Sequence, residues 1–549
     1  MKKILSILFL GSLFIFAGCE DGFLDRKPYD ALSSQGVWDS DETAQLEVTG
    51  IYRIANADYC LMSVPYRFSC WGPDGFNYFR DRAIECNSAT VYTGNYLNTY
   101  RAFYKLIRAS NDAIMHLTDN DKITATLRDQ LLGQAKFFRG ISYFYLWQCF
   151  GGVIIMDKVL NSEDTYLPRN SADEVKEFVI KDFTDAASLL PVSYSASEYG
   201  KVTRGAAIAM LGKVYLYDKQ WDMAVNTFSQ LFSAPFSYDL HEDYAQLFDY
   251  KWEQNKEVVF SLQEVAETNL GSSYDQWYGS RATNTYAQSY SFASHIPFET
   301  YTYCDGTEID KSTRPKRSDY ENEHDYGVDL MAWYDDVLHN HQVDKRLQAN
   351  IIMPTDTYVG KNDVVYKHYW PYADYANANP PAMRYEFSGY ALYAWRKFVC
   401  TGNELSNSLR WYSPTDIPLI RFADVLLMFA EAKNESQGPS QDVYDAVNRV
   451  RSRAGVVDLP AGLSKDEMRR YIWLERFHEF PGEGILFFDV RRWGTATSDD
   501  PVFGLNHDVL DFRGEKFFTR QFPEKFKLFP IPAAEIDIND KLTQNPGWE

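Results

Sequence analysis

The chain has 549 residues, 45% of them hydrophobic and 24% charged, which is typical of a globular protein with more than one structural lobe. Acidic side chains outnumber basic ones by 76 to 55 and give a net charge of −21, and no basic patch or nucleic-acid motif stands out, so we expect no nucleic-acid partner. Aromatic residues make up 16% of the chain. Surfaces that bind carbohydrate or peptide use such rings, which combine a flat apolar face with a polar edge.

Residues 1–18 predict a lipoprotein signal peptide. Lys2 and Lys3 precede an apolar run over residues 4–16, which is too short for a comfortable membrane span, and Ala-Gly-Cys19 follows. This ending resembles a bacterial lipobox, in which Cys19 becomes the lipidated first residue of the mature protein. The alternative is an ordinary signal peptide followed by a chance cysteine. No other segment is apolar enough to span a membrane, so the lipid is the expected anchor.

The next part of the chain alternates between helical spacing and one irregular stretch. Apolar residues recur at helical spacing in residues 43–54, 100–117 and 131–149. Residues 57–98 interrupt this pattern with Gly, Pro, Asp, Asn and aromatic residues that show no helical period. We interpret this stretch as a structured loop, a kind of segment that often carries function.

A tetratricopeptide repeat is predicted over residues 204–235. Residues of the expected size lie at five of its characteristic offsets, with Pro235 near the closing turn: Leu211, Gly212, Tyr215, Ala224 and Phe228. One repeat alone cannot form a stable solenoid. We therefore expect paired helices in residues 100–150, 171–190 and 417–453 to act as degenerate companions.

The helical periodicity of apolar residues is weaker between residues 236 and 416. Residues 257–262 are a strand candidate, and two zones, 270–304 and 358–395, are rich in aromatic residues without a regular period. We interpret this region as an irregular insert laid over the repeat scaffold.

Three helical signals follow one another from residue 417 to residue 494. The first includes Leu419 and Phe422 on one apolar face, and the third opens with a capping box formed by Ser464 and Glu467. A dense group of charges then lies among aromatic residues: Glu475, Arg476, Glu479, Glu483, Asp489, Arg491 and Arg492. Such a group could be an active site, but we favour a buried, salt-bridged structural corner, because buried charges must be paired.

Motifs of catalysis and metal binding are missing from the sequence. It contains no GxSxG, HExxH, P-loop or GxGxxG pattern and no His/Cys cluster at metal-ligand spacing. Asp335-Asp336 could suggest a pair of glycosidase carboxylates, and Asp305, Glu308 and Asp310 could suggest calcium, but chance acidic pairs and a turn explain them better. We predict no catalytic residue, no metal and no cofactor.

Four pieces of the sequence resemble the SusD/RagB family of outer-membrane nutrient-binding lipoproteins. They are RFADVLLMFAEAKNE, VNRVRSRAG, the ER..E..GEG..FFDVRRWG stretch and the terminal LFPIPAAEIDIN...TQNPGW. The pattern departs from the family at Pro481-Gly482, where a family member's helix would continue. The resemblance covers nearly all of residues 19–549 and is weakest in the insert.

The resemblance implies a mainly α fold: a tetratricopeptide-like helical-repeat scaffold with an irregular, loop-rich ligand-binding insert and few short strands. It divides the chain into the signal peptide at 1–18, a helical region at 19–235, the insert at 236–416 and the signature region at 417–549. Glu20 and Asp21, after the lipobox cysteine, resemble the tag that exports Bacteroidetes lipoproteins to the cell surface.

The implied function is a surface glycan-binding lipoprotein of the outer membrane. It would bind oligosaccharide or polysaccharide and deliver it to a partner TonB-dependent transporter of the SusC type. The alternatives are a RagB-like peptide-binding lipoprotein and, with less support, a glycoside hydrolase. The aromatic residues favour the glycan binder, and the missing catalytic motifs count against the hydrolase.

Ligand contacts are expected where the early loop and the insert place aromatic rings beside planar polar groups. The candidates are Trp71, Asp74, Asn77, Tyr78, Trp277, Tyr278 and Arg281. For each ring the alternative is packing beneath an irregular loop. The next candidate zone is Tyr369, Trp370 and Tyr372.

Overall fold

The computed structural model describes residues 36–549 except 79–81, 86, 161–163, 165, 268–269, 281, 283–286, 376, 384–390, 401 and 403–411. Helices dominate these residues, and the strands form only two-stranded sheets. The prediction of a mainly α fold with few short strands is confirmed. No helix in this described part is long and apolar enough to cross a membrane.

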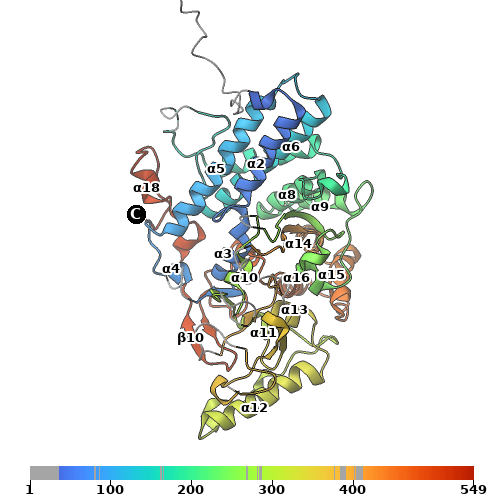
Figure 1. Ribbon diagram of the computed structural model, residues 1–549, viewed down its shortest axis with the longest axis vertical. Helices are drawn as coiled ribbons and strands as arrows, with labels where there is room; N and C mark the ends of the chain where they lie inside the picture. Colours follow the sequence, from blue (N-terminus) through green and yellow to red (C-terminus); the bar gives the residue numbers. More distant parts are fainter. Residues whose placement is uncertain are drawn as a thin grey trace, which may run out of the picture.

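Long helices pack side by side in the N-terminal part of the molecule (Figure 1). They are α2 (Asp41–Ala55), α5 (Gly94–Leu117), α6 (Ala125–Phe150) and α7 (Ala172–Leu189). Small residues allow α6 and α7 to approach closely, since a Cβ on Gly140 would lie 3.1 Å from the Phe183 ring. A capping box of Ser171 and Glu174 starts α7. These helices form the first part of the scaffold.

The predicted tetratricopeptide repeat is the helix pair α8 (Arg204–Tyr217) and α9 (Trp221–Ser229). A Cβ on Gly212 would lie 2.5 Å from the ring of Phe228, so only glycine lets the two helices approach this closely. Helix α9 also packs on α14 (Phe422–Gln437), which packs on α15 (Gln441–Ala454). The repeat therefore has the helical companions expected from the sequence.

Residues 417–421 differ from the prediction. Leu419 was expected on a helix with Phe422, but it lies in strand β8 (Ile417–Arg421), and α14 begins at Phe422. Strand β8 pairs antiparallel with β2 (Val258–Leu262), the strand expected at residues 257–262. Pro418 has no N–H for a helical hydrogen bond, whereas an extended chain there is paired along its edge. This small sheet joins the insert to the scaffold.

Between β2 and β8 the chain forms short elements. They are α10 (Tyr274–Trp277), β3 (Ser291–Ala293), α11 (Ile296–Thr300), α12 (Glu323–Asp335), α13 (Arg346–Asn350), β4 (Ile351–Ile352), β5 (Thr357–Val359), β6 (Val365–Lys367) and β7 (Ala394–Trp395). Strand β4 pairs with β7, and β5 pairs with β6. Figure 1 shows α12 at the end of the molecule farthest from α2 and α6. The domain boundaries at residues 235 and 416 stay predictions.

The C-terminal region returns to helix and then closes over the other parts. Its elements are α16 (Lys465–Glu479), α17 (Leu486–Arg492), β9 (Asp508–Leu510), β10 (Lys516–Thr519) and α18 (Ala533–Ile536). The predicted capping box of Ser464 and Glu467 opens α16. The helix ends at Glu479, where Pro481 follows and Gly482 adopts a left-handed φ of 81°. The departure at Pro481-Gly482 thus accounts for the local end of the helix.

Candidate functional site

The early loop and the insert meet along a short antiparallel sheet. Strand β1 (Gly75–Asn77) follows helix α3 (Val64–Trp71) and pairs with β3, with Asn77 opposite Ser291. One residue further, the backbone N–H of Tyr78 donates to the carbonyl of Tyr290 at 2.8 Å. Two segments more than 200 residues apart in sequence therefore form one continuous wall.

A cavity of about 350 Å³ opens beside this wall. Its lining combines two aromatic rings with two amides and three smaller or acidic side chains: Asp58, Met62, Ser273, Gln276, Trp277, Gln288 and Tyr290. We call this the Trp277 pocket. Its volume lies at the small end of the range for ligand pockets.

Trp277 is held in place by other rings. Tyr66 of α3 stacks on it with ring centroids 4.5 Å apart and an interplanar angle of 27°, and Tyr274 lies 5.6 Å away. The Asn77 amide donates to the hydroxyl of Tyr66 at 2.7 Å. Asn77 therefore positions Tyr66, and Tyr66 in turn fixes the indole at the pocket.

The amides of the pocket leave one buried acceptor free. Gln276 donates through Nε2 to Oε1 of Gln288 at 2.5 Å. The remaining Oε1 atom of Gln276 is buried and has no hydrogen-bond partner among the described residues, although the side chain is only 1% exposed. A buried polar atom without a partner is costly, so a rotation of the Gln276 amide toward the cavity that this residue lines would let a ligand hydroxyl or water bind it.

A charged and aromatic group borders the pocket at Asp58. The carboxylate of Asp58 is half exposed and lies 3.1 Å from Nη2 of Arg67. The Arg67 guanidinium covers the ring of Tyr59 at 3.6 Å from its centroid. Burial lowers the pKa of Arg67, but Asp58 and the neighbouring tyrosines outweigh it and hold that pKa above its usual value. The guanidinium therefore stays charged beside the pocket.

Two of the predicted ligand residues are core residues in the structure. Trp71 is 2% exposed and packs at right angles on Phe68 and Phe529. Asp74 is fully buried and accepts a hydrogen bond from the backbone N–H of Gly482 at 2.8 Å. This corrects the prediction for both residues, since neither has a surface open to a ligand and the packing alternative accounts for their burial.

Tyr278 also differs from the prediction, whereas the ligand contact of Tyr78 stays a prediction. Tyr278 is buried and donates its hydroxyl to the carbonyl of Gly482 at 3.3 Å. Tyr78 is half-buried against Phe517, with ring centroids 6.0 Å apart. Arg281 lies outside the described residues. Of the seven candidates, Trp277 lines the pocket and Asn77 supports it indirectly.

The next candidate zone is also mostly packed. Trp370 is 3% exposed and lies against Tyr326, and Tyr369 stacks on Tyr375 with centroids 4.3 Å apart. The side chain of Tyr372 lies outside the described residues. Sequence reasoning missed Gln276 and Gln288. The only available signal was that Gln276 directly precedes Trp277.

The C-terminal charges form a buried network. The Glu479 carboxylate accepts from Arg346 at 3.0 Å, from Arg421 at 2.9 Å and from Arg453 at 2.5 Å. Burial by itself would raise the pKa of Glu479, but Arg453, Arg421 and Arg346 lower it to about 2. Arg421 also binds Glu483 at 2.7 Å. The prediction that these charges are buried and paired is confirmed for this group, and their structural role stays a prediction.

Other members of the network tie the scaffold helices together. Arg476 of α16 binds Asp424 of α14 at 2.8 Å and Asp489 of α17 at 2.7 Å. Asp424 also receives Lys213 of α8 at 3.2 Å. The network therefore connects the tetratricopeptide pair to the C-terminal signature helices.

The acidic groups weighed for catalysis or calcium lie at the surface. Asp335 and Asp336 are both exposed on and beside α12 and line no enclosed cleft among the described pockets. Asp305 and Asp310 accept backbone N–H groups of their own turns, from Thr307 at 2.9 Å and Ser312 at 3.0 Å. Within the described residues no group of three or more His, Cys, Asp or Glu side chains is arranged to hold a metal ion.

Two family models match the chain. One, described as the SusD family, matches residues 256–548, which is more than half of the chain. The other, described as starch-binding and associating with the outer membrane, matches residues 22–216. The chain belongs to the SusD family, as its resemblance had indicated.

Individual relatives extend this result along the whole chain. An alignment of 578 positions with a SusD-like protein of Formosa agariphila covers 98% of this chain and 97% of that protein, at 25% identity. The starch-binding protein SusD of Bacteroides thetaiotaomicron is 27% identical over 161 residues, which cover 29% of this chain and 26% of that protein.

Solved structures share the fold. A SusD-like carbohydrate-binding protein of Bacteroides fragilis matches with a TM-score of 0.74 at 22% identity, covering 92% of this chain and 100% of that one. Surface glycan-binding protein A of Bacteroides thetaiotaomicron, in complex with laminarihexaose, matches with a TM-score of 0.65 at 19% identity, covering 92% and 99%. At these identities the likeness concerns the fold.

Proposed function

We propose that this chain is a cell-surface lipoprotein that binds oligosaccharide or polysaccharide. Family membership supports this class of function, because relatives are named as starch-binding or carbohydrate-binding and one related structure holds laminarihexaose. The Trp277 pocket supplies the chemistry that a sugar needs, an aromatic ring beside planar polar groups. The proposal includes no catalytic step.

The buried Oε1 atom of Gln276 is the observation that carries the proposal. It is buried and lacks a partner in the described structure, and its residue lines an open cavity together with Trp277. After a rotation of the Gln276 amide toward the cavity, a sugar hydroxyl would satisfy this acceptor while the sugar's C–H face covers the part of the Trp277 ring that is exposed.

The proposed delivery route begins at the lipid anchor. Cys19, outside the described residues, would carry the lipid, and Glu20 and Asp21 would direct export to the surface of the outer membrane. The bound glycan would then pass to a TonB-dependent transporter of the SusC type. Replacing Cys19 with Ala should release the protein from the membrane. Unchanged membrane fractionation and surface labelling of this variant would contradict the anchor.

A glycan array with a peptide library beside it tests the ligand class. We expect neutral oligosaccharides to be retained and peptides to pass. Retention of peptides instead would support the RagB-like alternative. Each retained glycan should also be recovered unchanged after incubation with the protein, and a shortened product would support a glycoside hydrolase.

Calorimetry on Gln276→Leu tests the pocket itself. The change removes the free acceptor but keeps a similar volume, so we expect at least a tenfold loss of affinity for an array-positive glycan. Gln230→Leu, at an exposed glutamine outside the pocket, is the control. Equal binding by parent and both variants would move the site away from Trp277.

A further inference from the structure

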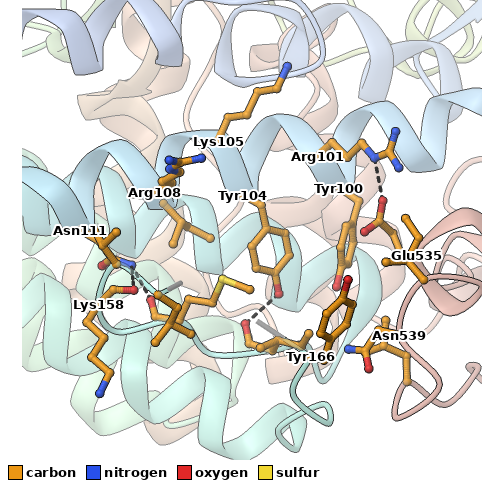
Figure 2. Close-up of a pocket in the computed structure, with 17 residues that line it drawn as sticks. Tyr100, Arg101, Tyr104, Lys105, Arg108, Asn111, Lys158, Tyr166, Glu535 and Asn539 are labelled. Carbon is orange, nitrogen blue, oxygen red and sulfur yellow. Dashed lines mark hydrogen bonds and ion pairs between the residues drawn. The ribbon is translucent and has the colours of Figure 1, made fainter. Parts of the chain in front are cut away.

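A larger groove, of about 560 Å³, runs along the outer face of α5 (Figure 2). One side is α5 from Tyr100 to Asn111, and the other sides come from residues 154–160 with Tyr166 and from residues 535–542. We call it the α5 groove. It shares no lining residue with the Trp277 pocket.

The helical period of α5 separates the groove into a floor and a rim. Tyr100, Tyr104, Ile107 and Asn111 recur every three or four residues and line the floor. One position further around the helix, Arg101, Lys105 and Arg108 repeat at the same spacing and are exposed. Figure 2 shows Tyr100 and Tyr104 projecting from α5 into the groove while Lys105 projects away from its floor.

Side-chain hydrogen bonds fix the walls. The Asn111 amide donates to the carbonyl of Met156 at 2.8 Å, and the Tyr104 hydroxyl donates to the carbonyl of Ile154 at 2.7 Å. On the other side, Asn539 donates to the carbonyl of Leu167 at 2.9 Å. The groove is therefore preformed, and the amides that could have bound sugar hydroxyls already hold the backbone.

The apolar part of the lining is mostly aliphatic. Ile154, Leu160 and Leu542 face the same space as Ile107, and Ile538 is 57% exposed at its edge. Aliphatic side chains accommodate leucine-like or aromatic anchors of a polypeptide, and the rings of Tyr100, Tyr104 and Tyr166, which also line the groove, can pack on such anchors. The aliphatic majority, together with wall amides that are already hydrogen-bonded, favours a protein segment over a carbohydrate.

The rim is positive in a chain that is strongly negative overall. Arg101 is paired with Glu535 at 2.6 Å. Lys105, Arg108 and Lys158 are exposed, and none of them has a carboxylate partner within the described residues. With 76 acidic against 55 basic side chains, three neighbouring cations left without a carboxylate favour an anionic occupant.

We propose that the α5 groove is a docking site for an acidic amphipathic segment of a partner polypeptide. Its apolar side chains occupy the floor over Tyr104 and Ile107, and its Asp and Glu residues face Lys105, Arg108 and Lys158. This is the helix-in-groove or extended-peptide mode of recognition, with the charges setting orientation and association rate.

Fluorescence anisotropy on the full chain in detergent tests this proposal. The probe is a labelled 14-residue peptide with leucines on one helical face and glutamates on the other. We expect saturable binding that weakens with salt. The same composition in scrambled order and a version with lysine in place of glutamate should bind at least tenfold more weakly.

Paired variants separate the groove from general charge effects. Lys105→Glu with Arg108→Glu should weaken probe binding at least tenfold. Arg53→Glu with Lys256→Glu, which reverses two exposed charges outside the groove, should leave it unchanged. Ile538→Gln should weaken binding severalfold, whereas Leu46→Gln, another exposed apolar residue, should not.

Three outcomes would overturn the proposal. They are no binding of the amphipathic probe, equal loss in the groove and control variants, or tighter binding of acidic oligogalacturonate that depends on the same two cations. The last result would assign the groove to an anionic glycan. Circular dichroism of each variant excludes unfolding as the cause of a lost signal.

Discussion

The C-terminal charge network and the Trp277 pocket look alike in sequence and differ in the structure. Both place polar side chains among aromatic rings. In the network each carboxylate oxygen of Glu479 meets an arginine, whereas in the pocket the buried Oε1 atom of Gln276, a residue that lines the cavity, meets no partner among the described residues. Polar density is therefore a poor guide to a binding site. Proximity to an open volume separates the two regions, because buried atoms without a partner also occur in the network, at Arg453 and Arg476.

The largest expected effect is on the network. Glu479→Gln removes the charge that three arginines share, so we expect the free energy of unfolding to fall by about 3–5 kcal/mol. Chemical denaturation measures it. Asp39→Asn, which breaks the exposed pair with Lys122, should leave the melting temperature almost unchanged. A Glu479→Gln protein with parental stability and no glycan binding would make the network a ligand site.

Trp71→Ala should destabilise the protein by roughly 3 kcal/mol, because a large cavity would form between Phe68 and Phe529. Thermal and chemical unfolding measure this. Below the melting temperature the folded variant should bind an array-positive glycan like the parent. A stable variant that loses binding would return Trp71 to the ligand surface.

Trp277→Ala should have the opposite effect to Trp71→Ala, with weaker glycan binding in a protein that still folds. Losing the ring that lines the pocket should cost about 2 kcal/mol of binding, a drop of more than tenfold in affinity. Calorimetry gives the affinity, and circular dichroism checks the fold. If Trp277→Ala binds a verified glycan as the parent does, the pocket is not the site.

The smallest expected effect concerns pH. Burial raises the pKa of Asp74 from 3.8 to about 6, despite the hydrogen bond from Gly482. The folded state then binds more protons than the unfolded state between these values, so the contribution of Asp74 to stability falls as pH rises. Asp74→Asn should become more stable relative to the parent by about 1 kcal/mol between pH 5 and pH 7. If the difference in the free energy of unfolding between Asp74→Asn and the parent is the same at both pH values, the raised pKa is contradicted.

Sequence reasoning predicted what depends on local periodicity. The helices and the capping box at Ser464 have signals within a few residues of one another, and the close approach of Gly212 to Phe228 has one within a single repeat. Leu419 was wrongly placed on the helix, because the spacing of a short apolar run just before a helix does not show whether the run itself is a strand or the first turn of the helix. The strand conformation of Leu419 is set by the pairing of β8 with β2, which lies about 160 residues away in the sequence.

The site could be predicted only in part, because burial is a property of distant contacts. Trp71 and Trp277 lie in similar aromatic and polar surroundings along the sequence. Their roles separate only because Phe529 covers one and Tyr66 holds the other against a cavity. The pairing of Gln276 with Gln288 had no local signal.

Gly482 connects the early loop to the insert, near the Trp277 pocket, through a single residue. Its N–H binds Asp74 of the early loop, and its carbonyl binds Tyr278, the neighbour of Trp277. The φ of 81° and a Trp395 ring 3.3 Å from where a Cβ would lie both require glycine here. The approach of the early loop to the insert is therefore held by the backbone of one glycine, so side chains of the pocket can change without altering this link.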